Sequence, residues 1–312
     1  MIDRDLRIGV VGATGAVGRV TLDFLAERGY RRVRAFASSR SAGGRVGDLV
    51  VEEATEGSLG AGDLDVCFFS VGTRPSRELV PVAAGAGALC IDKSAAFRLQ
   101  EGIPLVVPEV NGGRARENTG IVANPNCCTI PLTMVLAPLR DAAGLERVRV
   151  ATYQSVSGAG TAAVDALRAE TPDEHRLRMD WDFDGVEFDE EVKLREETRK
   201  ILELPELPVS ATCVRVPVPV GHAESVWVET EEPLDAARAR EVLAAAPSVQ
   251  VEDFPTPRAA AGGDEVLVGR IRPDRAGDGL SLHLACDNLR KGAALNGIQI
   301  AELVLSQRRI AA

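Results

Sequence analysis

Three glycines between an apolar run and a helical pattern constrain the fold of this chain more than any other feature. Gly12, Gly15 and Gly18 follow the strand-like run Arg7–Val11 and precede the helical stretch Arg19–Arg28. In such a strand–turn–helix unit, the first glycine permits a tight turn and the second lets a pyrophosphate approach the backbone. The third allows close packing of the helix on the sheet. The pattern predicts a dinucleotide-binding loop; the alternative is a tight turn in a sheet that binds no nucleotide.

The first half of the chain alternates short apolar runs with helical stretches. After the glycine loop, the strand-like runs are Arg32–Ala37, Val66–Val71, Leu89–Asp92, Leu105–Val107 and Ile121–Ala123, with a helical stretch at Arg77–Ala86. Strands that alternate with helices indicate a parallel sheet with helices on both faces. We therefore predict an α/β protein whose N-terminal domain is a Rossmann-type doubly wound parallel sheet. Its last strand leads to a cysteine-containing loop at the strand's carboxyl end, where such sheets place their sites.

The pattern changes after residue 145. Strand-like runs occupy Val148–Val156, Val209–Val220, Ser225–Glu231, Glu265–Ile271 and Ser281–Ala285, and helical stretches occupy Thr161–Ala169 and Glu190–Leu202. Many strands with few helices indicate a second, α+β domain built on a mixed or antiparallel sheet. The final apolar-faced helix, Gly292–Gln307, is expected to pack back on the first domain. We expect a cofactor-binding domain at 1–125 plus 292–312, and a catalytic domain at 126–291.

Charge and hydropathy exclude two classes of partner. The net charge of −10 argues against nucleic acid, because binding a duplex requires clustered cations. No apolar run approaches the ~20 residues that cross a bilayer, and the N-terminal residues do not resemble a signal peptide. We expect a cytoplasmic protein with reduced thiols. We also expect no metal, because the few histidines do not cluster with cysteines along the sequence.

The residues after the second strand favour one nicotinamide cofactor. An NAD enzyme usually carries an acidic residue there, which binds the ribose 2′-hydroxyl. This chain has Ser38, Ser39 and Arg40 instead. Hydroxyls and a guanidinium bind a 2′-phosphate that a carboxylate would repel. The sequence therefore favours NADP.

Cys127 is the strongest candidate for a reactive side chain. It follows Asn124-Pro125-Asn126 and precedes an apolar run, so it lies where a loop becomes a helix. Unpaired N–H groups and the positive dipole end of a helix favour a thiolate there. A nucleophilic sulfur with a nicotinamide cofactor indicates aldehyde–acyl redox chemistry through a thioester. The alternative is a buried apolar thiol, which we expect for Cys128, about 100° further around the helix.

His222 and the pair Glu190–Lys193 each allow two interpretations. His222 follows a strand-like run, where it is either a turn histidine or the acid and base that serves a nucleophilic cysteine. Glu190 and Lys193 are one helical turn apart, so a surface ion pair is the alternative to a site role.

These residues together resemble the aspartate-semialdehyde dehydrogenase family along nearly the whole chain. The matching stretches are Gly12–Gly18, Ser38–Gly43, Ser94–Arg98, Val107–Asn111, Asn124–Thr129, Tyr153–Gly160, Glu190–Ile201, Arg215–Glu224 and Asp287–Asn296. The combination is highly specific, whereas the glycine loop alone is not.

The resemblance implies a role for each matching residue. Cys127 would be the nucleophile, His222 the acid and base, and Gln154 the residue that orients the acyl intermediate. Substrate binding would involve Arg215 at the carboxylate, Glu190 at the amine, and Arg98, Asn126 and Lys193 at phosphate. The NADP site would be lined by Gly12, Thr14, Gly15, Ala16, Val17, Ser38, Arg40, Ser157, Gly158 and Asn288.

The implied reaction is the NADPH-dependent reductive dephosphorylation of L-aspartyl-4-phosphate to L-aspartate 4-semialdehyde. It would be reversible and phosphate-dependent, would pass through a Cys127 thioester, and would serve lysine, methionine and threonine synthesis. The resemblance also implies a homodimer, with the large sheet of the second domain as the contact face.

The chain departs from the family pattern at two places. Lys93 stands where the family usually has Asn, and the region Thr161–Asp189 is shorter than expected and lacks an Asn-x-Ile-Pro stretch. That region tends to contribute to the subunit interface of the family.

Three other functions stay open. N-acetyl-glutamyl-phosphate reductase shares the chemistry, but its loop normally reads Asn-Pro-Gly-Cys, and this chain has Asn126. A paralog acting on another semialdehyde in specialised metabolism is a second alternative. The third is a catalytically silent NADP-binding regulator, which should have lost Cys127, Gln154 or His222.

Overall fold

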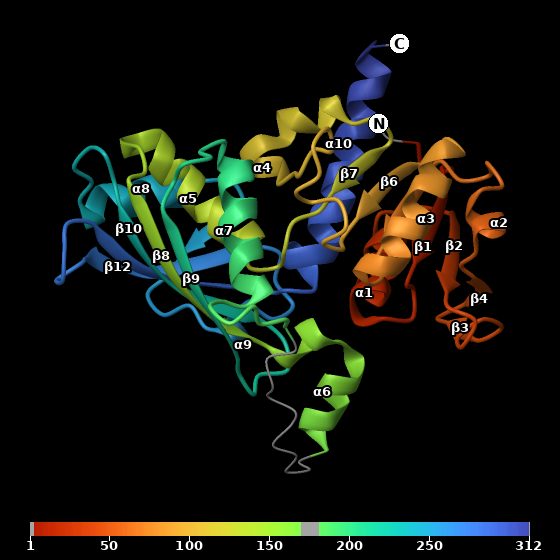
Figure 1. Cartoon of the computed structure of the whole chain (residues 1–312), viewed down its shortest axis with the longest axis horizontal. Helices are drawn as coiled ribbons and strands as arrows, with labels where there is room; N and C mark the ends of the chain where they lie inside the picture. Colours follow the sequence, from red (N-terminus) through yellow and green to blue (C-terminus); the bar gives the residue numbers. More distant parts are fainter. Residues whose placement is uncertain (1–2, 170–180, 312) are drawn as a thin grey trace. The chain divides into compact units, whose positions relative to one another are not determined.

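A computed structural model describes residues 3–169 and 181–311 of the chain. It divides into two compact units, residues 1–126 with 293–312 and residues 127–292. The labels of Figure 1 are used below, and each unit is described by itself. No helix within the described ranges is long and apolar enough to span a membrane.

The N-terminal unit is an α/β unit. Its strands are β1 Arg7–Val11, β2 Arg32–Ala37, β3 Arg45–Val46, β4 Leu49–Glu53, β5 Val66–Phe69, β6 Leu89–Asp92 and β7 Ile121–Ala123. Its helices are α1 Ala16–Glu27, α2 Glu56–Leu59, α3 Thr73–Gly85, α4 Pro108–Asn111 and, from the end of the chain, α10 Leu295–Ala311.

The sheet of this unit has the strand order β3-β4-β2-β1-β5-β6-β7. All its pairs are parallel except the short β3–β4 hairpin. The chain runs outward from β1 through β2 in one direction and through β5 in the other, so the strand order reverses beside β1. Ligands of such sheets bind at the carboxyl ends of the strands at this point, and the glycine loop follows β1 there. The predicted doubly wound parallel sheet is confirmed.

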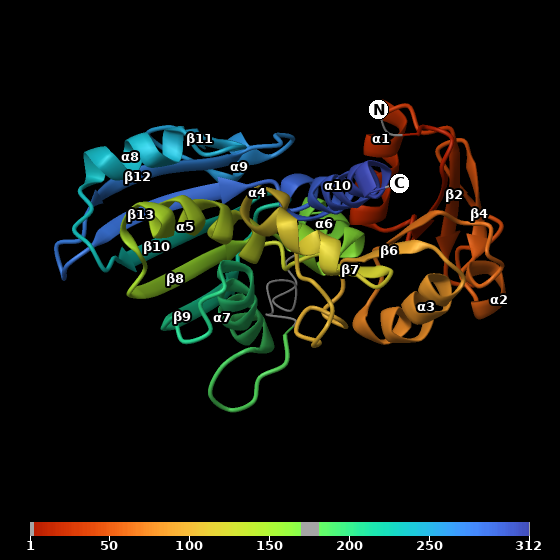
Figure 2. The ribbon, with the colours of Figure 1, turned by 90° about the horizontal axis from the view of Figure 1, so that it is seen from above.

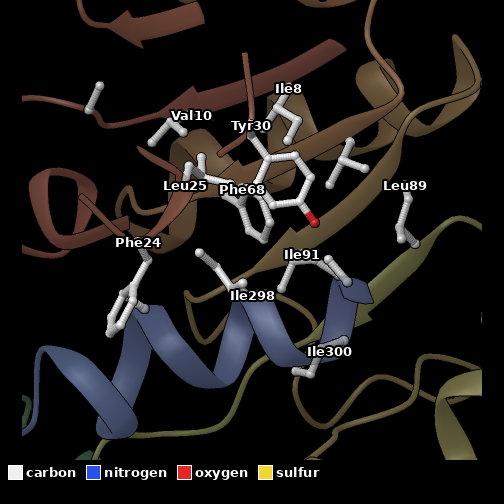
Figure 3. Close-up of a cluster of buried hydrophobic side chains, with 14 of the residues drawn as sticks. Ile8, Val10, Phe24, Leu25, Tyr30, Phe68, Leu89, Ile91, Ile298 and Ile300 are labelled. Carbon is white, nitrogen blue, oxygen red and sulfur yellow. The ribbon is translucent and has the colours of Figure 1, made fainter. Parts of the chain in front are cut away.

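The core of the N-terminal unit joins both ends of the chain. Figure 3 shows Ile298 of α10 facing Phe68 of β5 and Ile91 of β6, with Phe24 of α1 beside the helix. All four side chains are at most 2% exposed. The prediction that the final helix packs on the first domain is confirmed. It is the burial of apolar area that holds this helix in place, at about 25 cal/mol per Å² removed from water.

Several features of this unit differ from the sequence prediction: β5 ends at Phe69 rather than Val71, and α3 spans Thr73–Gly85 rather than Arg77–Ala86. Leu105–Val107 is no strand and contributes only an isolated bridge from Leu105 to Ala123. The β3–β4 hairpin was not predicted, because a short turn at Gly47 separates two runs too brief to show alternation. α1 begins at Ala16, inside the glycine pattern, rather than at Arg19.

The C-terminal unit is an α+β unit. Its strands are β8 Arg147–Gln154, β9 Val209–Arg215, β10 His222–Glu229, β11 Val249–Val251, β12 Val266–Pro273 and β13 Leu280–Cys286. Its helices are α5 Thr129–Ala143, α6 Thr161–Arg168, α7 Asp189–Leu202, α8 Ala236–Ala244 and α9 Pro257–Ala260.

The second sheet is mixed, as predicted. Its order is β11-β12-β13-β10-β8-β9, with parallel pairs only at the two edges. The helices α7, α5 and α8 lie side by side across one face, which we call the covered face (Figure 2). The opposite face carries the partly exposed side chains of Tyr153, Trp227 and His283, and we call it the open face.

Two strand boundaries of this unit differ from the prediction in a way that matters for the site. β9 ends at Arg215 rather than Val220, because Pro217 and Pro219 cannot donate to a ladder. β10 begins at His222 rather than Ser225, so the histidine is the first residue of a strand. Of the predicted unassignable segment Thr171–Asp189, residues 171–180 lie outside the described residues.

Candidate active site

The ends of four neighbouring strands of the mixed sheet meet at one edge. β8 ends at Gln154 and β9 at Arg215, and these two residues are register partners. β10 begins at His222, and β13 ends at its register partner Cys286. Because successive residues of a strand alternate between faces, Gln154 and His222 both lie on the covered face. The strand register therefore brings together residues that are far apart in the sequence.

Cys127 lies at the start of α5, beside the ring of His222. Its Sγ is 3.2 Å from Nε2 of His222. Cys128 is the N-cap residue of α5, so Cys127 immediately precedes the helix. Cys127 is partly exposed, whereas Cys128 is 1% exposed, as predicted for a packed thiol. The helix N-terminus and the imidazole both favour the ionised form of the Cys127 sulfur.

The hydrogen bonds of Nδ1 determine which ring nitrogen of His222 carries the proton. Nδ1 accepts the main-chain N–H of Ser155 at 3.0 Å, and the Ser155 hydroxyl lies 3.1 Å from the same nitrogen. A main-chain N–H only donates, so Nδ1 carries no proton. The proton of the neutral ring is then on Nε2, which faces Cys127. His222 thus presents a hydrogen-bond donor to the sulfur and stabilises a thiolate.

A buried polar network holds this histidine in place. Asn288, 2% exposed, accepts the Ser155 hydroxyl at 3.1 Å and the main-chain N–H of Gly221 at 2.9 Å. Its Nδ2 donates to the Ser157 hydroxyl at 2.9 Å. The network joins the segment after β8, the segment after β13 and the residue before His222. Asn288 and Ser157, which the family resemblance assigns to the cofactor site, also support the ring of His222.

Helix α7 orients the amide of Gln154. Gln154 is 1% exposed; its Nε2 donates to Glu190 at 2.9 Å, and its Oε1 accepts the Thr152 hydroxyl at 3.2 Å. Lys193 lies 3.5 Å from Glu190 and 2.6 Å from Asp189. The ion pair that spacing predicts is therefore present, but Glu190 is buried beside Gln154 rather than on the surface.

Arg215 is positioned by an aromatic ring and a carbonyl. Its guanidinium carbon lies 4.8 Å from the ring centroid of Trp181, and Nη1 donates to the Ser155 carbonyl at 2.9 Å. Gly158 makes room for this side chain, since a Cβ there would lie 2.8 Å from Nη1. A guanidinium held in one orientation presents the planar fork that matches a carboxylate.

Residues 7–118 match a family model described as semialdehyde dehydrogenase, NAD binding domain. Residues 136–182 and 180–291 match one described as semialdehyde dehydrogenase, dimerisation domain. An aspartate-semialdehyde dehydrogenase of Streptomyces akiyoshiensis is 45% identical, over 97% of this chain and 99% of the relative. The chain belongs to the aspartate-semialdehyde dehydrogenase family.

Solved structures agree with this family. A Vibrio cholerae aspartate semialdehyde dehydrogenase II, complexed with ASA, has a TM-score of 0.90 and 39% identity, and covers 97% of this chain and 99% of its own. A Candida albicans aspartate semialdehyde dehydrogenase with NADP has a TM-score of 0.78 and 25% identity, over 97% and 99% of the two chains. The family resemblance inferred from sequence is confirmed, and the chain is an oxidoreductase of this family with a nicotinamide-binding domain.

The glycine loop has the geometry that a pyrophosphate requires. A Cβ at Gly12, where φ is +85°, would lie 2.3 Å from the Ser70 carbonyl oxygen, and one at Gly18 would lie 2.1 Å from that of Gly12. Only glycine fits at these two positions. At Gly15, the N-cap of α1, a Cβ would meet only the Gly12 oxygen at 3.4 Å. The protein leaves room there, so a nicotinamide dinucleotide fits this loop.

The remaining cofactor candidates of the N-terminal unit follow β2 or lie within the loop and the first turn of α1. The main-chain N–H groups of Gly12 and Ala13 donate to the Phe36 carbonyl, two residues before Ser38. Ser38 and Arg40 are exposed after β2. The other predicted contacts in the loop and the first turn of α1 are Thr14, Ala16 and Val17.

Two predicted substrate residues belong to the N-terminal unit. Arg98 is 8% exposed and donates to the Asn124 carbonyl at 3.0 Å and to the Lys93 carbonyl at 2.7 Å. Asn126 is 7% exposed and directly precedes Cys127 in the chain. The other proposed catalytic and substrate residues gather in the C-terminal unit.

Sequence reasoning missed three residues of this aspartate-semialdehyde dehydrogenase site. The main-chain N–H of Ser155 determines which nitrogen of His222 is protonated, and the ring of Trp181 packs against the guanidinium of Arg215. Glu224, fully buried beside Cys128, lies two residues after His222 and hence on the same strand face. Strand alternation could have found Glu224. Burial, together with a charge on Cys127, raises the pKa of Glu224 well above its usual range and keeps the carboxyl neutral.

The sequence argument against a metal rests on the separation of histidines from cysteines along the chain, and this reason is wrong in the folded structure. Histidine and cysteine do cluster in space, because Nε2 of His222 and the sulfurs of Cys127 and Cys128 lie within 4.8 Å of one another. A metal ligand needs an unprotonated Nε2, and the Ser155 N–H places the proton on that atom. The prediction that the reaction uses no metal stays a prediction, on this different ground.

Proposed function

We propose that the chain catalyses the NADPH-dependent reductive dephosphorylation of L-aspartyl-4-phosphate to L-aspartate 4-semialdehyde, reversibly. Membership of the family and the Vibrio cholerae relative complexed with ASA support the substrate. The observation that carries the mechanism is the 3.2 Å approach of Cys127 Sγ to the Nε2–H of His222.

In this proposal Cys127 acts as a nucleophile. The thiolate attacks the acyl carbon of the substrate, the bond to the phosphate oxygen breaks, and a thioester forms. The nicotinamide cofactor, when bound, supplies the hydride that reduces this thioester. The sulfur then leaves as a thiolate, and the Nε2–H of His222 donates a hydrogen bond to it. His222 therefore favours both the attacking and the departing sulfur, and Gln154 orients the acyl group.

Substrate recognition is shared among charged and polar side chains. Arg215 binds the substrate carboxylate, for which its fixed guanidinium is suited. Glu190 binds the amine. Arg98, Asn126 and Lys193 hold the phosphate group. The positions of Glu190, which accepts the Gln154 amide, and of Arg215, the register partner of Gln154, support these roles.

The proposed cofactor is NADP rather than NAD. Ser38 and Arg40 are exposed after β2 and offer hydroxyl and guanidinium donors to a 2′-phosphate. The glycine loop would hold the pyrophosphate, while Ser157, Gly158 and Asn288 would contact the nicotinamide end. The NADP complex of the Candida albicans relative supports this choice.

We also propose a homodimer formed through the open face of the mixed sheet. The family's dimerisation model covers this sheet, and partly exposed aromatic residues support a contact there. Residues 1–125 with 292–312 would bind the cofactor, and residues 126–291 would carry catalysis and dimerisation. The reaction would take place in the cytoplasm and supply lysine, methionine and threonine synthesis.

The test is phosphate-dependent NADP reduction by the variants Cys127→Ala and Cys128→Ser. We expect Cys127→Ala to lose at least about a thousandfold in kcat, because a nucleophile has no substitute. Cys128→Ser, one residue further on, should keep most of the activity. Near-normal turnover by Cys127→Ala would exclude the covalent route.

Assays with several semialdehydes distinguish the alternatives. L-aspartate 4-semialdehyde should be the preferred substrate. A preference for N-acetyl-glutamate semialdehyde or another semialdehyde would favour a related reductase or a specialised paralog, and no turnover with any would favour a regulator.

A further inference from the structure

Among the cysteines of this chain, Cys127 is the thiol best suited to reaction with an oxidant. All six cysteines lie in the described ranges, and five of them are buried while Cys127 is partly exposed. Burial raises the pKa of Cys213 and Cys286 above the usual value for a thiol, so these stay protonated. Oxidation follows thiolate character and exposure, and both favour Cys127.

A second thiol lies within reach of this sulfur. The Sγ atoms of Cys127 and Cys128 are within 4.8 Å of each other. Cys128 has no part in the proposed reaction, and its side chain, at the N-cap position of α5, is 1% exposed. Burial raises the pKa of Cys128 well above its usual value, so the thiol is itself resistant to oxidants from solvent.

We propose that Cys128 is a resolving cysteine, which converts oxidised Cys127 into a reversible vicinal disulfide. A peroxide transfers one oxygen to the Cys127 thiolate, giving a sulfenic acid and hydroxide. The sulfur of Cys128 then attacks the sulfenic sulfur; its proton and the sulfenic hydroxyl leave as water, and the S–S bond forms. The two cysteine sulfurs together give up two electrons, which reduce the peroxide, so no further reactant is needed.

The neighbouring positions of the two residues make this disulfide easy to reduce. Their Cα atoms are joined by one peptide unit and are about 3.8 Å apart, below the roughly 4.4–6.8 Å of an ordinary disulfide. A strained disulfide is readily reduced by cellular thiols, which restores the nucleophile. Sulfinic and sulfonic acids are not restored in this way. Cys128 thus protects Cys127 from irreversible loss.

Formation of the disulfide would inactivate the enzyme only if Cys127 is the nucleophile, so the predicted inactivation rests on the proposed function. Formation of the disulfide itself does not depend on that function. The experiment therefore has two readouts. The full chain is treated with hydrogen peroxide. The mass of the peptide that contains residues 127 and 128 is then measured by mass spectrometry, and turnover is measured before and after addition of dithiothreitol. The variants are Cys128→Ser and, as a matched buried thiol on β9, Cys213→Ser.

We expect the wild-type peptide to lose two hydrogens, with turnover lost and then regained on reduction. Cys213→Ser should behave like the wild type. In Cys128→Ser the peptide should gain two or three oxygens, and reduction should restore no activity. Equal over-oxidation of the wild type and Cys128→Ser would overturn the proposal, as would a disulfide between two chains. A vicinal disulfide that leaves turnover intact would support the proposal and exclude Cys127 as the nucleophile.

Discussion

At the residue scale, the chemistry of His222 depends on one main-chain hydrogen bond. The Ser155 N–H at Nδ1 leaves the ring proton on Nε2, 3.2 Å from the Cys127 sulfur. The family resemblance implies that His222 is the acid and base, a role that suits an imidazole because it titrates near neutral pH. The observed contacts favour a different role, in which the ring donates a hydrogen bond to the sulfur rather than exchanging a proton with it. No sequence pattern shows which ring nitrogen is protonated, since the donor is a backbone group.

Gly158 provides a residue-scale test of substrate recognition. A Cβ at Gly158 would lie 2.8 Å from Nη1 of Arg215, so Gly158→Ala should displace the guanidinium. We expect kcat/KM for the carboxylate substrate to fall by about 10- to 100-fold, mainly through KM, because small misplacements are costly in an oriented site. Steady-state kinetics measure this. Gly113→Ala, where no atom lies within 4 Å of the new Cβ, is the control.

The amine of Lys93 lies beside two hydroxyl groups and an aromatic ring. Its Nζ is 3.2 Å from the Ser70 hydroxyl, 3.4 Å from the Thr21 hydroxyl and 5.2 Å from the Phe68 ring centroid. Desolvation lowers the pKa of Lys93 to about 7, partly offset by the charge of Asp92. Unfolding returns the pKa to about 10.4.

This difference in pKa predicts how stability depends on pH. Between about pH 7 and pH 10 the unfolded chain binds a proton at Lys93 that the folded chain does not. Stability therefore rises with pH, by at most about 1.4 kcal/mol per pH unit, and levels off below pH 7. Urea unfolding at pH 7 and pH 9 should show a gain of up to about 2 kcal/mol that Lys93→Met lacks. Identical pH dependence in both proteins would contradict this assignment.

At the element scale, the site depends on where strands end. Alternation predicted most strands of both sheets, but it extended β9 through Pro217 and Pro219 and began β10 three residues late. Proline removes a ladder donor, so the strand stops at Arg215. The true boundaries place Arg215 and His222 at the same edge of the sheet. Pairing with the neighbouring strands decided these boundaries.

Gly221 allows the chain to enter β10. Its φ is +95°, and a Cβ there would lie 2.3 Å from the Pro257 carbonyl oxygen. We expect Gly221→Ala to destabilise the chain and to reduce kcat, because the clash moves His222. Gly262→Ala is a matched control with φ +85° and no atom within 4 Å, and should cost only the backbone strain of about 1–3 kcal/mol. Urea unfolding and kinetics of both variants give the comparison; equal losses would show that the contact with Pro257 is unimportant.

At the scale of the whole molecule, the two faces of the mixed sheet are covered by different elements. The short helix α9 packs on part of the open face, through Ala260 against Ala223, Leu267 and Ala285. α5, α7 and α8 pack on the covered face, and the open face carries Tyr153, whose ring centroid is 6.3 Å from that of His283. Sheets of this size normally bury an apolar face against another layer. A second copy of the chain supplies that layer in the proposed homodimer.

Tyr153→Asp tests this interface. Tyr153 is 37% exposed, so the change should leave the isolated chain folded but place a charge in the proposed contact. We expect the dimer dissociation constant to rise about 30-fold or more, the ratio for a 2 kcal/mol interface residue. Sedimentation velocity across a dilution series measures it. Val50→Asp on β4, at 56% exposure, is the control, and equal behaviour of the two variants would place the interface elsewhere.

The sequence by itself determined the two sheet types, the glycine loop, the position of Cys127 before a helix, and the family. These features depend on local patterns, namely alternation, turn glycines and short motifs, which a chain shows without folding. The tertiary structure decided the approach of Cys127 to His222, the ring proton set by Ser155, the stacking of Arg215 on Trp181, and the adjacency of Glu224 to Cys128. Each of these depends on strand register, helix packing or loop placement, which bring together residues that are distant in the sequence.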